Sequence, residues 1–156
     1  MKLSVISESS APEPIPSFHG EFAFLSNFYP SPVTVDGITF PTVEHAFQAA
    51  KTNDPETKRQ IAAKDTPGKA KRAGGKRGIV RDFDPNWETR KVDVMRSLVQ
   101  QKFQDPQLRE MLLQTGDPPL IEGNVWNDTF WGVCRGKGAN NLGKILEQIR
   151  NELRGV

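Results

Sequence analysis

Four predicted helix N-termini in the middle of this chain share one sequence pattern, and together they predict a mostly helical fold. In each, an Asp or Thr immediately precedes a proline; the four pairs are Asp54-Pro55, Thr66-Pro67, Asp84-Pro85 and Asp105-Pro106. The first side chain can accept a hydrogen bond from a free N–H of the first turn, and the proline stands where no N–H is needed. The pairs predict helices over about 55–63, 67–74, 86–103 and 106–115, the last ended by Gly116.

Apolar spacing predicts two more helices, one on each side of this region. Apolar residues at helical spacing indicate a helix over 42–51, and a second such stripe indicates one over about 141–153. Before the first, two β-rich runs flank Asp36-Gly37, a dipeptide that accepts the positive φ angles of a type I′ turn, so that 32–40 is a predicted hairpin. The predicted fold class is α+β, a compact single domain that is mostly helical with a small antiparallel β-hairpin or sheet.

The length of 156 residues fits one domain, expected over 17–156. Residues 1–16 hold three prolines and four serines and are expected to be a flexible leader, with order beginning near Phe18. A single cysteine, Cys134, excludes an intrachain disulfide, and two histidines make a His-rich metal centre unexpected. Neither a membrane-spanning run nor the long apolar core of a signal peptide is present, so a cytoplasmic protein with no membrane partner is predicted.

Positive charge is concentrated in one stretch. Residues 64–81 carry seven basic side chains against one acidic, although the net charge of the whole chain is only +2. Such a patch suits a phosphate-bearing partner by electrostatic attraction. A basic helix that is simply solvated accounts for the charge equally well.

Two carboxylates are candidates for chemistry. On the predicted helix 42–51, Glu44, Gln48 and Lys51 share one side, a pattern that a solvated helix face also produces. Asp128 lies in 118–141, an irregular segment rich in Trp, Gly and Asn that predicts either a binding loop or an aromatic plug over the core. If that segment folds over the helix, the two carboxylates flank one cavity. Such a pair suits glycosidic cleavage, in which positive charge develops on the sugar.

Several segments in the same order resemble the NADAR (YbiA-like) family. The resemblance begins in 22–51, with a Ser-Asn-Phe element followed by a Glu-His pair that opens a helix. It continues in 70–74, in Asp84-Pro85-Asn86-Trp87 with the helix after it, in 127–132 and in 136–143. Together these blocks span about 18–153.

The resemblance implies an N-glycosidase with a compact, mostly helical α+β fold and no metal or other cofactor. It implies as substrate either ADP-ribose linked to guanine, free or within DNA or RNA, or the ribosylamino-pyrimidine phosphates of the riboflavin pathway. Glu44 and Asp128 would be catalytic. The implied substrate-binding residues are Asn27, Gln48, Lys51, Lys71, Trp87, Asn127, Trp131, Gly132 and Asn141.

Two other classes of protein fit the same residues. A binding module would recognise ADP-ribose or a nucleotide in the same pocket without hydrolysing it. A nucleic-acid-binding protein would use the basic stretch and the tryptophans for backbone and stacking contacts.

Overall fold

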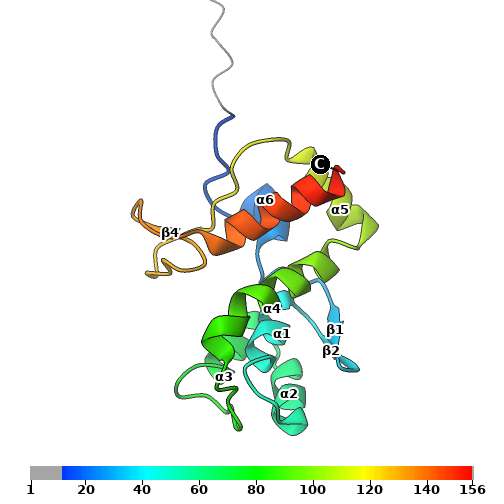
Figure 1. Cartoon of the computed structure of the whole chain (residues 1–156), viewed down its shortest axis with the longest axis vertical. Helices are drawn as coiled ribbons and strands as arrows, with labels where there is room; N and C mark the ends of the chain where they lie inside the picture. Colours follow the sequence, from blue (N-terminus) through cyan, green and yellow to red (C-terminus); the bar gives the residue numbers. More distant parts are fainter. Residues whose placement is uncertain (1–11, 156) are drawn as a thin grey trace, which may run out of the picture.

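Six α-helices form the framework of residues 12–155, the part of the chain that the computed structural model describes. They are α1 (Val43–Ala49), α2 (Pro55–Ala62), α3 (Pro67–Ala73), α4 (Trp87–Lys102), α5 (Pro106–Gln114) and α6 (Asn141–Leu153). Figure 1 shows α2 and α3 at one end of the molecule and α5 and α6 toward the other, with the long α4 between them. All six lie within a residue or two of the predicted helices.

The strands are few and short, which confirms the predicted α+β class. Strands β1 (Val33–Val35) and β2 (Ile38–Phe40) pair antiparallel, and φ angles of 50° at Asp36 and 79° at Gly37 match the predicted turn. Sequence patterns missed two elements. These are a 3-10 helix, η1 (Gly20–Leu25), and a parallel pair of two-residue strands, β3 (Gly123–Asn124) and β4 (Val133–Cys134), within the segment predicted to be irregular.

Three of the four predicted helix caps are confirmed. The side chains of Asp54, Thr66 and Asp105 each accept an N–H from the first turn of their helices. The prediction for Asp84 was wrong, because α4 begins only at Trp87. The buried Asp84 carboxylate instead accepts the N–H of Asn86 at 2.8 Å and pairs with the guanidinium of Arg90. Both interactions hold Asp84 just outside the helix.

The chain enters the core before Phe18, where order was expected to begin. Of the expected leader, residues 1–11 lie outside the described residues. Ile15 is buried, its N–H donates to the carbonyl of Pro119 at 2.9 Å, and its carbonyl accepts the N–H of Ile121 at 3.0 Å. A single apolar side chain with a backbone partner on each side is enough to fix this segment.

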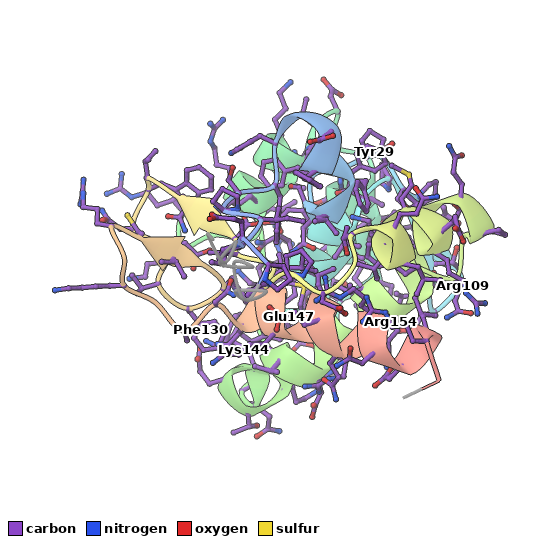
Figure 2. All side chains as sticks on the ribbon, turned by 90° about the horizontal axis from the view of Figure 1, so that it is seen from above. Tyr29, Arg109, Phe130, Lys144, Glu147 and Arg154 are labelled. Carbon is purple, nitrogen blue, oxygen red and sulfur yellow. The ribbon has the colours of Figure 1, made fainter. Side chains whose placement is uncertain are left out.

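Helix α6 holds the segment that leads into the candidate site. Its apolar face is buried, and polar side chains along it and at the residue just after it bind the chain between α5 and β3; Glu147 and Arg154 are labelled in Figure 2. Glu147 accepts the N–H of Leu120 at 2.9 Å, Arg150 donates to the carbonyl of Pro118 at 2.9 Å, and Arg154 pairs with Asp117. None of the helices described in 12–155 has the length and apolar character that crossing a membrane requires.

Candidate active site

A cavity of about 550 Å³ opens beside α1, within the size range of small-molecule sites. Its walls come from α1, from α3, from the segment 26–30 and from the loop between β3 and β4. Residues far apart in sequence thus meet at one place. The lining includes seven of the predicted site residues: Asn27, Glu44, Gln48, Lys51, Lys71, Asp128 and Trp131.

Helix α1 is fixed at its start by a cap and by a buried histidine. The Thr42 hydroxyl accepts the N–H of His45, and the His45 ring bonds to that hydroxyl at 2.8 Å and to the carbonyl of Lys64 at 2.9 Å. His45 does not line the cavity, so its part is to tie α1 to the chain after α2. Because α1 cannot rotate, Glu44 and Gln48 stay on its cavity side.

Glu44 is a buried carboxyl that shares its cavity with two lysines. Its Oε1 accepts a hydrogen bond from the Gln48 amide at 3.1 Å. Burial raises the pKa of Glu44 above its ordinary value, and the Gln48 bond and the positive charges of Lys71 and Lys51 oppose that rise. The negative charge of Asp128 adds to the rise. A carboxylate that is largely removed from water can stabilise positive charge much better than one that water surrounds.

Close packing of α1 on α3 brings both lysines to this carboxyl. A side-chain carbon at Gly74, just past α3, would clash with the Gln48 side chain, so the contact requires glycine. The ammonium group of Lys51 donates to the carbonyl of Gly74 at 3.0 Å, and burial lowers the pKa of Lys51. Lys71 reaches the cavity from α3 and lies 5.9 Å from the ring centre of Trp126.

Asp128 makes hydrogen bonds within the loop between β3 and β4, and these bonds both stabilise the loop and fix the position of the residue. Its Oδ1 accepts the N–H groups of Phe130 at 3.2 Å and Trp131 at 2.9 Å. The Asn124 amide donates to the Asp128 carbonyl at 2.8 Å and accepts the Asp128 N–H at 3.0 Å. These bonds fix the loop between β3 and β4 and bring the carboxylate to the cavity that Glu44 also lines.

A row of aromatic rings closes one side of the cavity. Phe47 and Trp131 both line it, with ring centres 5.4 Å apart. Trp87 was predicted to contact the ligand, but it is buried behind Phe47, 5.0 Å from that ring, and is not part of the lining. Its large apolar side chain supports the wall from the core.

Three further predicted residues lie outside the lining and position the loop. Asn127 is exposed, and its side-chain oxygen faces Arg135. Gly132 is buried, and a side-chain carbon there would clash with the carbonyl of Glu122. Asn141, the first residue of α6, donates from its amide to the carbonyl of Phe130 at 2.9 Å.

Sequence reasoning missed Glu122, a third carboxyl of the cavity. Burial, together with the negative charges of Asp128 and Glu44, raises the pKa of Glu122 to about 7. The residue stands in a segment without periodicity, and only the packing against α6 and the β4 strand brings it to the cavity. In the described part of the chain, no three His, Cys, Asp or Glu side chains converge closely enough to hold a metal ion.

A buried lysine on α4 stabilises the wall of the cavity. The ammonium group of Lys102, on α4, donates to the carbonyl of Ser26 at 2.8 Å, next to the cavity residue Asn27. Burial lowers the pKa of Lys102 to about 7.

We expect Lys102 to make stability rise with pH. Between pH 7 and 10.5 the unfolded chain binds a proton at this lysine that the folded chain does not, so the free energy of unfolding increases across that window. The increase approaches about 1.4 kcal/mol per pH unit. Urea denaturation at pH 7.5 and 9.5 measures it. Lys102→Met should flatten the difference, the exposed control Lys144→Met should not, and an unchanged slope in Lys102→Met would contradict the assignment.

Comparison with known proteins finds relatives over most of the chain. Residues 17–154 match the model of the NADAR domain. The chain is 40% identical over 135 residues to N-glycosidase YbiA of Escherichia coli (strain K12), covering 85% of this chain and 82% of that protein. It is 38% identical over 136 residues to the riboflavin biosynthesis protein VVA0006 of Vibrio vulnificus, covering 83% of this chain but 35% of that longer protein. The NMR structure of E. coli YbiA superposes with a TM-score of 0.79 at 35% identity, covering 96% of this chain and 90% of that one.

Proposed function

The chain belongs to the NADAR family, and from this membership and the geometry of the cavity we propose that it is an N-glycosidase that hydrolyses a bond between ribose and nitrogen. The observation that carries the proposal is the position of Glu44 and Asp128 on one cavity, in unlike surroundings. Cleavage of such a bond spreads positive charge over the anomeric carbon and the ring oxygen. Carboxylates fixed before the reaction stabilise that charge without having to reorganise.

The roles of the lining residues follow from their chemistry. Glu44 would lie beside the anomeric carbon and orient the attacking water, and Asp128 would hold ribose hydroxyls or assist the water. The amides of Asn27 and Gln48 would bond to the sugar or base, and Trp131 would stack on the ligand. In the described chain, Oδ1 of Asn27 and Oε1 of Gln48 are buried and have no hydrogen-bond partner, a costly state that a hydrogen bond from a ligand would relieve once these side chains turn toward it.

Two substrate classes fit this site. A ribosylamino-pyrimidine 5′-phosphate agrees with the name of the Vibrio relative, and the lysines at the cavity would bind its phosphate. ADP-ribose on guanine agrees with the features around the opening. Trp126 is 52% exposed and Phe130 36%, and the basic stretch 64–81 contributes Lys71 to the lining. Exposed aromatic rings next to basic groups suit bases and phosphates of a larger substrate.

We expect Lys71→Gln to raise KM about tenfold and to weaken its dependence on salt, because Lys71 is the basic-stretch residue that lines the cavity. Lys69→Gln is a matched control two residues earlier on α3, where the lysine pairs with Asp65 in solvent. Steady-state kinetics at two salt concentrations separates the two variants. Equal KM values for both variants would remove Lys71 from phosphate binding.

The experiment that tests the proposal is a mass-spectrometric assay on both substrates in parallel. One is an oligonucleotide that carries ADP-ribosylated guanine, and the other is the ribosylamino-pyrimidine 5′-phosphate. Free ADP-ribose or free ribose 5-phosphate would identify the substrate class. Binding of either compound without release of any product would instead favour a non-catalytic module.

A further inference from the structure

Glu122 is unlike the other two carboxyls of the cavity in its bonding. Glu44 is bonded to an amide, and Asp128 is bonded to two backbone N–H groups. Oε2 of Glu122 is buried and has no hydrogen-bond partner among the described residues. A buried carboxyl oxygen that no hydrogen-bond donor reaches is costly to keep ionised, so this setting favours the protonated form of Glu122.

The backbone around Glu122 is rigid, which fixes where its side chain lies. Its N–H donates to the side-chain oxygen of Asn140 at 3.0 Å, and its carbonyl accepts the N–H of Val133 at 2.9 Å. Gly132 packs directly against it, where a side-chain carbon would clash with both the carbonyl and the Cγ of Glu122. Asn140, the residue before α6, and Val133 of β4 therefore hold the backbone of Glu122 beside the cavity.

We propose that Glu122 is the general acid of the site and gives its proton to the departing nitrogen. The inference rests on the proposed N-glycosidase function. It follows from three carboxyls on one cavity in three different settings, an arrangement that lets them divide the tasks of acid, base and charge stabilisation. Among residues 12–155, no hydrogen-bond donor reaches the buried Oε2 of Glu122 to favour a charged form, and Glu122 is therefore the member of the three suited to hold a proton.

The step balances as a hydrolysis. The bond between the anomeric carbon and nitrogen breaks, its electron pair stays on nitrogen, and nitrogen takes the proton of Glu122. Water then adds to the cationic carbon and gives a proton to the Glu44 carboxylate, which releases it to solvent. Glu122 regains a proton from solvent, so one water is consumed for each bond broken. An amine nitrogen that left without this proton would leave as an unstable anion.

The charged groups around Glu122 decide over which pH range it holds the proton. Burial raises its pKa most, Asp128 from the loop and Glu44 from α1 raise it further, and Lys71 from α3 and Lys102 from α4 lower it, with a result of about 7. Activity on an N-riboside should therefore fall above about pH 7 as Glu122 loses its proton. It should also fall on the acid side, where Glu44 becomes protonated at a pH above its ordinary 4.5.

Glu122→Gln tests the proposal, because glutamine keeps the shape of the protonated carboxyl but cannot transfer its proton. On the N-riboside that the wild-type protein turns over, we expect a loss of about 10²–10⁴-fold in kcat and disappearance of the basic limb of the pH profile. On 4-nitrophenyl ribofuranoside 5-phosphate, whose leaving group departs without a proton, we expect the loss to stay within about tenfold. The variant should melt no lower than wild type at pH 8, since it removes a buried carboxyl that ionises there.

Glu110→Gln, an exposed carboxyl on α5, is the matched control and should behave as wild type on both substrates. Equal losses of Glu122→Gln on both substrates, or a basic limb that survives in the variant, would overturn the role of Glu122 while the N-glycosidase proposal stands. A wild-type protein that releases no base from any N-riboside would instead overturn the proposed function itself.

Discussion

Glu44→Gln should fold as the wild-type protein does and lose about 10²–10³-fold in kcat, the usual cost of removing one preorganised charge-stabilising group. Glutamine keeps the length of the side chain and can still bond to Gln48, so the packing of α1 is preserved. What it removes is the negative charge beside the developing cation. Because the ground-state contacts change little, KM should change much less than kcat.

The control for this prediction is Glu56→Gln, an exposed glutamate on α2 that is not part of the cavity lining. Turnover is followed by release of free base, and folding by far-UV circular dichroism and thermal melting. A Glu44→Gln protein with near wild-type turnover would show that this carboxylate is not part of the chemistry.

Trp87→Ala should have the largest effect on stability, a loss of about 3–5 kcal/mol in the free energy of unfolding. Trp87 is only 4% exposed and supports Phe47, so truncation leaves a cavity directly behind the wall of the site. Urea denaturation measures the loss. Trp126→Ala, which truncates a half-exposed ring of the same kind, should cost less than about 1 kcal/mol.

Substitutions at Trp87 and Trp131 distinguish a residue that supports the cavity wall from one that contacts the ligand. Trp87→Phe keeps most of the apolar volume and should bind substrate almost as wild type, whereas Trp131→Ala removes a ring that lines the cavity and should raise KM. If Trp87→Ala left stability unchanged but abolished binding, the placement of Trp87 behind Phe47 would be wrong.

The helices were predictable from sequence because their signals are local. Asp54, Thr66 and Asp105 cap helices with bonds that span three residues, and apolar spacing sets the buried face of α6. Asp84 shows the limit of such reasoning. Asp84 also precedes a proline, as the other three residues do. Its hydrogen bond with the N–H of Asn86 and its ion pair with Arg90 keep it outside the helix.

The site was predictable only where it lies on a helix or in a recognised family block. Glu44 and Gln48 of α1 and Lys51, two residues after its end, all line the cavity, and the comparisons confirm the family whose resemblance pointed to Asp128 and Lys71. Sequence could not separate Trp131, which lines the cavity, from Trp87, which lies behind it, because that depends on where Phe47 packs. Glu122 was missed for a related reason. Its position follows from contacts with Asn140 and Val133, which no local pattern records.

Hydrolysis of an N-riboside in water enriched in ¹⁸O, with the products weighed by mass spectrometry, tests the N-glycosidase function most directly. Cleavage at the anomeric carbon predicts that the released sugar carries the heavy oxygen, that the base does not, and that no label enters phosphate. Glu44→Gln should show the same labelling at a much lower rate. Label found in phosphate, or label-free products from a wild-type protein that binds the N-riboside, would contradict an N-glycosidase.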